Sequence, residues 1–220
     1  MPSAIASQRL DSVLRRLFAA AALDDEIDEP APPPGVTSWS QAASADRSNA
    51  FEDYYLPISA QAGNLLYALT RAIRPDTVIE FGTSYGISTL YLAAAVADNG
   101  VGHIITTELS TKKAAAAHAN LEQAGVADRV TIMTGDALET LADVPGPISL
   151  VLLDGWKNLC LPVLRMLESK LRPGALIAAD DTTLDSMASY LSYVRDPANG
   201  YVTIAFPVED GIELSSWVSG

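Results

Sequence analysis

From residue 59 onward, short apolar runs typical of buried strands alternate with segments of helical periodicity. Five such runs are followed by two β-rich runs that flank Asp210-Gly211, a common hairpin turn. Strands separated by helices pair in parallel, because each crossover returns the chain to the same edge of the sheet. We therefore expect an α/β fold with a doubly wound, seven-stranded sheet that is mostly parallel and ends in an antiparallel C-terminal hairpin.

The expected strands are short and rich in branched apolar residues. They cover 77–81, 104–107, 130–133, 148–153, 175–179, 201–207 and 212–218. The expected helices cover about 65–73, 88–96, 111–123, 136–142, 158–171 and part of 184–194. The helix at 158–171 is expected to end at Pro173-Gly174, since proline cannot continue a helix and glycine often ends one.

The first 55 residues do not follow this alternation and are expected to extend the main domain, 56–220. Apolar residues at i, i+3 and i+4 spacing predict an amphipathic helix at about 6–22. We expect it to dock on the domain's own core, with a dimer contact or a cover for the active site as alternatives. Residues 23–53 combine an acidic stretch with four prolines and predict a long loop or broken segment, usually a lid or disordered.

Charge and hydropathy exclude several classes of function. With 14 Lys plus Arg against 27 Asp plus Glu, the net charge of −13 would repel phosphate backbones, so no nucleic-acid partner is expected. No apolar run approaches the ~18 residues of a membrane span, so no membrane partner is expected. Arg9, Asp11 and Arg15 interrupt any signal-peptide core, which favours a cytoplasmic protein. The single cysteine, Cys160, excludes an internal disulfide framework and a four-thiolate zinc site.

A glycine loop, Glu80 to Ser88, connects the first strand to its helix. Gly82 and Gly86 allow a tight turn and a close approach of the backbone to a ligand. The dinucleotide-binding fingerprint would need a third glycine where Ser84 stands, which disfavours a pyrophosphate ligand.

Acidic residues follow or end three successive strands, where an open α/β sheet binds its ligands. Glu80 suits a ligand with a positive ammonium group, and Glu108 could accept both hydroxyls of a ribose. Asp136 and Ala137 could border an adenine edge. The alternative for each acid is that it caps a helix.

The same loop also contains Gly82-Thr83-Ser84-Tyr85-Gly86, the G-x-S-x-G pattern of a serine-hydrolase nucleophile elbow. That mechanism needs a histidine on a late loop. His103 and His118 both come early, and residues 119–220 contain no histidine. The sequence therefore disfavours a serine hydrolase.

Three carboxylates follow the fourth and fifth strands. Asp154 lies in Asp-Gly-Trp-Lys, and Asp180 and Asp181 follow Ala-Leu-Ile-Ala-Ala. Clustered like charges raise one another's pKa, and a bound cation offsets this cost. Oxygen ligands favour magnesium, manganese or calcium over zinc. Lys157 is a candidate base. The alternatives are helix capping by the aspartates and a solvated surface lysine.

Taken together, these motifs resemble those of the class I S-adenosylmethionine-dependent methyltransferases, specifically the metal-dependent, catechol O-methyltransferase-like group. The resemblance spans about 56–220. It is carried by VIEFGTSYGIS, Glu108, GDALETL, LLDGWK, AADD and the closing DGIEL. It implies a Rossmann-like fold, S-adenosylmethionine as cofactor, a divalent metal (Mg²⁺, Mn²⁺ or Ca²⁺) and a small aromatic hydroxyl acceptor as partner.

The resemblance also implies roles for individual residues. At the methionine part of the cofactor, Glu80 would contact the amino group, and Gly82 and Ser88 the carboxylate. Glu108 would contact the ribose, and Asp136 and Ala137 the adenine. Other cofactor contacts would come from Ile58, Asp154 and Trp156. Asp154, Asp180 and Asp181 would hold the metal, and Lys157, beside Asp154, would take the phenolic proton. The group usually has Asp-Asn in place of Asp180-Asp181, and the extra negative charge disfavours a dianionic acceptor.

The resulting hypothesis is an O-methyltransferase that acts on an aromatic with vicinal hydroxyls, such as a catechol or a caffeoyl-type compound. In that reaction the protein chiefly aligns an oxygen with an activated methyl group, while a metal fixes the vicinal oxygens and lowers a hydroxyl pKa. A metal-independent methyltransferase and a cofactor-binding protein without methyl transfer stay as alternatives. A homodimer is left open.

Overall fold

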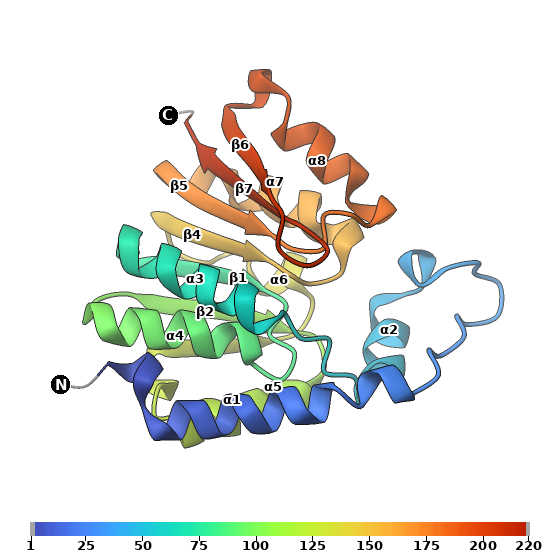
Figure 1. The fold of residues 1–220 in the computed structure, drawn as a ribbon. Helices are drawn as coiled ribbons and strands as arrows, with labels where there is room; N and C mark the ends of the chain where they lie inside the picture. Colours follow the sequence, from blue (N-terminus) through green and yellow to red (C-terminus); the bar gives the residue numbers. More distant parts are fainter. Residues whose placement is uncertain (1–2, 219–220) are drawn as a thin grey trace.

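The structure is a computed structural model that describes residues 3–218. Its sheet has seven strands in the order β3-β2-β1-β4-β5-β7-β6 (Figure 1). The strands are β1 Thr77–Phe81, β2 His103–Glu108, β3 Val130–Thr134, β4 Ile148–Leu153, β5 Leu171–Ala179, β6 Tyr201–Phe206 and β7 Ile212–Trp217. β1 to β5 pair in parallel, and β7 runs antiparallel to both β5 and β6. The predicted doubly wound sheet with an antiparallel C-terminal hairpin is confirmed.

Helices cover both faces of the sheet. They are α1 Gln8–Ala21, α2 Ser44–Ala50, α3 Ala60–Ile73, α4 Ile87–Asn99, α5 Thr111–Ala124, α6 Ala137–Thr140, α7 Cys160–Leu167 and α8 Ala188–Val194. Side chains alternate across each strand, so neighbours such as Val78 and Ile79 enter different cores. One core packs against α1, α3, α4 and α5, and the other against α6, α7 and α8. None of the helices described within 3–218 is long and apolar enough to cross a membrane.

The N-terminal helix docks on the body of the same chain. α1 begins at the N-cap Ser7, whose hydroxyl accepts from the Leu10 amide, and its apolar stripe joins the first core. Leu10 and Leu17 are at most 1% exposed. Arg16 Nη2 donates to Asn120 Oδ1 of α5 at 2.7 Å. Docking on the chain's own core therefore accounts for the predicted stripe.

The segment expected to be a long loop, 23–53, contains more structure than the sequence indicated. It holds the short helix α2 and two single-turn 3-10 helices, Asp24–Glu26 and Trp39–Gln41. The sequence of α2, Ser-Ala-Asp-Arg-Ser-Asn-Ala, has no apolar stripe. Its buried side chain is that of Arg47, so contacts with the rest of the molecule, and not periodicity, stabilise this helix.

The prediction that a helix continues to Pro173-Gly174 is wrong. α7 ends at Leu167, one 3-10 turn follows, and β5 begins at Leu171. Pro173 and Gly174 lie inside β5, where its register with β4 shifts between Ile148 and Leu150. An irregular strand start tolerates a residue without an amide hydrogen, so here proline belongs to a strand and does not end a helix.

The parallel register aligns the carboxyl ends of the strands, where the candidate site residues follow. Phe81, the last residue of β1, pairs with Thr107 of β2 and with Leu153 of β4, and Leu153 pairs with Ala179 of β5. The residues that come next in sequence therefore leave the sheet side by side, as the sequence predicted for its candidate site.

Truncation of Leu17 tests whether α1 is part of the core. We expect Leu17→Ala to lower the free energy of unfolding by about 2–5 kcal/mol, because a buried side chain is lost and a cavity remains. The control is Leu23→Ala, at a side chain that is 53% exposed, with an expected change within about 0.5 kcal/mol. Urea denaturation measures both. Equal effects of the two substitutions would mean that α1 is not docked.

Candidate active site

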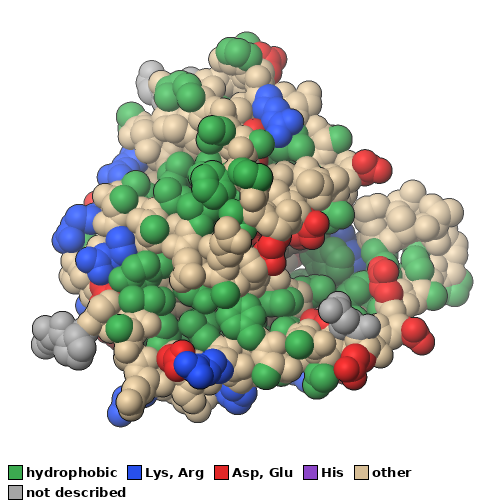
Figure 2. All heavy atoms as spheres, in the orientation of Figure 1, with side chains coloured by type: hydrophobic (Ala, Val, Ile, Leu, Met, Phe, Trp, Pro, Cys, Tyr) green, Lys and Arg blue, Asp and Glu red, His purple; other side chains and the backbone are tan. Residues whose placement is uncertain are grey.

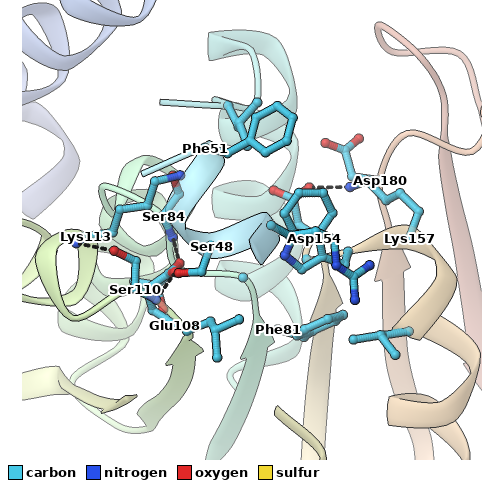
Figure 3. Close-up of a pocket in the computed structure, with 18 of the residues that line it drawn as sticks. Ser48, Phe51, Phe81, Ser84, Glu108, Ser110, Lys113, Asp154, Lys157 and Asp180 are labelled. Carbon is cyan, nitrogen blue, oxygen red and sulfur yellow. Dashed lines mark hydrogen bonds and ion pairs between the residues drawn. The ribbon is translucent and has the colours of Figure 1, made fainter. Parts of the chain in front are cut away.

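A cavity of about 530 Å³ opens along the carboxyl ends of the strands and is roofed by the segment that contains α2 (Figure 3). This volume is within the range of small-molecule sites, about 300–1,000 Å³. Of the residues singled out in the sequence, those that line it are Ile58, Gly82, Ser84, Ser88, Glu108, Asp136, Ala137, Asp154, Trp156, Lys157, Asp180 and Asp181. Figure 2 shows acidic side chains around a hollow between this segment and the body of the molecule.

The glycine loop forms the turn that its sequence predicts. Gly82 has φ of +102° and Gly86 has φ of +88°, a region that glycine enters without strain. Ser84, between them, has φ of +46°. Its amide donates to Glu108 Oε2 at 2.8 Å, which ties the loop to the end of β2. The backbone thus closes over the end of β1 beside the cavity.

Glu80 lies below the cavity and not in its wall. It is fully buried, and its carboxylate accepts hydrogen bonds from Ser88 Oγ at 2.7 Å and Thr89 Oγ1 at 2.6 Å. Burial raises the pKa of Glu80 to about 7, and the hydroxyl hydrogen bonds limit that rise. Its predicted contact with a ligand ammonium group stays a prediction, and Ser88 is the neighbour that reaches the cavity.

Two further acids are held by backbone amides. Glu108 accepts from Ser84 through Oε2 and from Ser110 through Oε1, each at 2.8 Å. Asp136 is the N-cap of α6, because its carboxylate accepts a hydrogen bond from the Leu138 amide at 2.8 Å. For this residue the helix-cap interpretation is therefore correct. Both residues still line the cavity.

The three aspartates after β4 and β5 come together around one lysine. Each of Asp154, Asp180 and Asp181 offers an oxygen atom, and these atoms all lie within 4.8 Å of one another. Lys157 Nζ lies 2.8 Å from Asp154 Oδ1 and 2.9 Å from Asp181 Oδ2. The lysine side chain is 12% exposed, so it is not a solvated surface lysine. Figure 3 shows the lysine turned toward these carboxylates.

Burial and mutual repulsion control the protonation of this cluster. Burial alone would lower the pKa of Lys157, but Asp154 and Asp181 outweigh it and raise the pKa well above its usual range. Burial, together with the charges of Asp154 and Asp181, raises the pKa of Asp180 to about 8. Three oxygen donors whose carboxylates outnumber the one lysine beside them fit a hard divalent cation such as Mg²⁺, Mn²⁺ or Ca²⁺.

The competing interpretations of these residues fail on geometry. The 3-10 turn before α8 has Leu184 as its N-cap and receives no side-chain cap, so Asp180 and Asp181 are not helix caps. Ser84 Oγ donates to the Tyr55 carbonyl at 2.7 Å. Within residues 3–218, no histidine lines the cavity, so Ser84 has no histidine base.

Sequence reasoning missed a group of cavity residues. They are Glu29, Trp39, Arg47, Ser48 and Phe51 from the N-terminal extension, Lys113 from α5, and Glu209 from the turn between β6 and β7. The available signal was two aromatic residues, Trp39 and Phe51, in an otherwise polar, proline-rich segment. Their rings pack edge to face at 5.1 Å, and Phe51 also lies 5.5 Å from the Trp156 ring.

Comparison with known proteins agrees with this geometry. Residues 79–182 match the family model described as a methyltransferase domain. A catechol O-methyltransferase of Mycobacterium tuberculosis is 38% identical over 141 residues, 64% of this chain and 63% of that protein. The chain therefore spans less than two thirds of the length of this relative.

Solved structures extend the similarity over more of the chain. Cofactor-bound Rv0187 from MTB is 26% identical, with a TM-score of 0.71 over 96% of this chain and 91% of that chain. The O-methyltransferase TomG from Streptomyces achromogenes, solved with SAM, is 25% identical, with a TM-score of 0.65 over 84% of this chain and 92% of that chain. The sheet order and the glycine loop agree with the fold of these methyltransferase structures. These matches make the chain similar to S-adenosylmethionine-dependent O-methyltransferases.

Substitution of Gly82 tests how closely the glycine loop packs. A Cβ at Gly82 would lie 2.7 Å from the Asp154 carbonyl oxygen and 2.7 Å from the Gly155 amide nitrogen. Gly100 also has a positive φ, +71°, but a Cβ there would meet nothing within 4 Å. We expect Gly100→Ala to lower the free energy of unfolding by about 1 kcal/mol, and Gly82→Ala by at least about 1 kcal/mol more. Chemical denaturation compares the two, and equal losses would contradict the close packing.

Proposed function

We propose that this chain transfers a methyl group from S-adenosylmethionine to a hydroxyl of a small aromatic with vicinal hydroxyls, assisted by a divalent cation. The observation that carries the proposal is the cluster of Asp154, Asp181 and Lys157 in the wall of the same cavity as Glu108. The name of the Mycobacterium tuberculosis relative, a catechol O-methyltransferase, supports a catechol-like acceptor. The SAM-bound neighbour supports the methyl donor.

The cofactor end of the cavity would be formed by the loops after β1, β2 and β3. Glu108, already fixed by two amides, presents a carboxylate to the ribose hydroxyls. Gly82 and Ser88 would contact the methionine carboxylate, Asp136 and Ala137 the adenine, and Ile58 and Trp156 the cofactor's apolar surface. S-adenosylmethionine supplies a methyl group already activated on a sulfonium, so alignment is the main task of the protein.

The acceptor end would be formed by the loops after β4 and β5. Asp154, Asp180 and Asp181 would hold the cation, whose charge would lower the pKa of an acceptor hydroxyl and offset the repulsion among the carboxylates. Lys157 is an ammonium while it pairs with Asp154 and Asp181, and a cation bound by these carboxylates would lower its pKa. The neutral amine would then accept the hydroxyl proton, while the S–CH₃ bond breaks and the O–CH₃ bond forms. Asp154 and Asp181 keep Nζ at this end of the cavity.

One observation favours a metal-independent variant of the same reaction. The ammonium group of Lys157 already lies between Asp154 and Asp181, where it pairs with both carboxylates and offsets part of their charge without a metal. In that variant the aspartates hold Lys157 near the acceptor and bind no ion.

Turnover with and without a chelator tests the proposal and separates these variants. Catechols and caffeoyl-type compounds are incubated with methyl-labelled S-adenosylmethionine and Mg²⁺ or Mn²⁺. We expect O-methylated product, its loss in EDTA and its return when the metal is restored. Full activity in EDTA would favour the metal-independent variant. Tight S-adenosylhomocysteine binding without product from any acceptor would indicate a cofactor-binding protein.

Removal of the lysine separates proton transfer from binding. We expect Lys157→Ala to slow turnover by about 10²–10⁴-fold, which is the usual contribution of a general base. Raising the pH should partly restore the rate, because hydroxide can replace the missing base. The control is Lys170→Ala, since Lys170 does not line the cavity. An unchanged rate in Lys157→Ala would exclude Lys157 as the base.

A further inference from the structure

Arg47 of α2 contacts the loop after β4 at two residues, one on each side of Lys157. Its Cζ lies 4.7 Å from the centre of the Trp156 ring, within the range of a cation–π contact. Its Nη1 donates to Asn158 Oδ1 at 2.8 Å. Arg47 also lines the cavity, yet it comes from the N-terminal extension, 111 residues before Asn158 in the chain.

The surroundings of Arg47 are unusual for an arginine. Its side chain is 3% exposed, it makes no ion pair within the described residues 3–218, and its Nε has no hydrogen-bond partner there. Burial lowers the pKa of Arg47, and the charge of Asp136 offsets only part of this effect. A buried guanidinium without a carboxylate costs stability, so folding alone does not favour arginine at this position.

The loop that Arg47 contacts has few bonds of its own. Lys157–Leu159 forms a single 3-10 turn, closed by the Leu159 amide to the Trp156 carbonyl at 2.8 Å and by the Cys160 amide to the Lys157 carbonyl. Such short turns have weak internal hydrogen bonding. Asp154 and Asp181 hold the end of the Lys157 side chain, while the placement of its backbone depends also on the contacts that hold Trp156 and Asn158 from outside.

We propose that Arg47 is a positioning residue for methyl transfer. Its guanidinium fixes the Trp156 ring through a cation–π contact and the Asn158 side chain through a hydrogen bond. Because Lys157 lies between these two residues, its backbone is held in place. Arg47 touches neither reacting atom. This inference rests on the proposed function for its effect on turnover, but the effect on the loop itself is independent of any reaction.

Three variants test the proposal. Arg47→Met removes the charge and the donors at similar length, and Asn158→Ala removes the acceptor at an exposed position where folding is not at risk. Arg47→Lys keeps a cation over Trp156 but loses the planar fork. The control for the cation–π contact is Arg165→Met, because the exposed Arg165 also lies over an aromatic ring, 5.4 Å from the centre of Tyr193, but does not line the cavity.

Hydrogen exchange measures the loop directly, and kinetics measures the consequence. In Arg47→Met we expect the amides of 155–159 to exchange about tenfold faster, with those of β4 unchanged, since one charge-assisted hydrogen bond and one cation–π contact are lost. We expect kcat to fall about tenfold at an unchanged acceptor KM, and S-adenosylhomocysteine to bind several-fold more weakly, because Trp156 is displaced. Asn158→Ala should show part of each effect, Arg47→Lys should lie between Arg47→Met and the unsubstituted chain, and Arg165→Met should show none.

The outcomes are distinguishable from a failure of the proposed function. If the unsubstituted chain neither binds S-adenosylhomocysteine nor turns over, the proposed function fails, and hydrogen exchange still decides whether Arg47 holds the loop. If the unsubstituted chain is active and Arg47→Met leaves both the exchange of 155–159 and kcat unchanged, Arg47 does not position Lys157 and the inference is overturned. A fall in kcat with unchanged exchange would also overturn it, because the effect would not pass through the loop.

Discussion

The parallel register of β2, β1, β4 and β5 is the constraint on which the rest of the site depends. Phe81 of β1 pairs with a residue in each of its neighbours, β2 and β4. Its partner in β4, Leu153, in turn pairs with Ala179 of β5. A parallel ladder gives its strands one direction, so the chain leaves every strand at the same edge. Segments far apart in sequence therefore share one cavity. The helices between the strands return the chain from the carboxyl end of one strand to the amino end of the next.

This arrangement concentrates negative charge. The residues after β4 and β5 bring three aspartates close enough to bind one cation. Burial there raises the pKa of Asp180 and so disfavours its ionised form. Lys157 is the cation that the chain itself provides, and the raised pKa of its side chain reflects how strongly the cluster needs one. A cluster of this kind is unfavourable for stability, and its excess negative charge is the feature on which the proposed ion binding and proton transfer depend.

The N-terminal extension completes the cavity from the other side. Asp24 accepts hydrogen bonds from the amides of Tyr55 and Leu56, and the Tyr55 ring stacks on Tyr85 of the glycine loop at 4.1 Å. Phe51 lies beside Trp156, which follows β4. The extension thus contacts both the loop after β1 and the loop after β4. It is therefore part of the wall of the site as well as a covering of the core.

The sequence by itself determined the doubly wound sheet, the amphipathic N-terminal helix and the positions of Glu108, Asp154 and Asp180 after their strands, since hydrophobic periodicity and strand order require no distant contact. It misplaced the start of β5, because the signal of Pro173 is local and a register shift is not. Only the tertiary structure decided that Lys157 lies between two carboxylates, that Glu80 is below the cavity and that Arg47 roofs it. Those facts depend on segments with no fixed spacing in the sequence, and packing, not periodicity, determines where such segments meet.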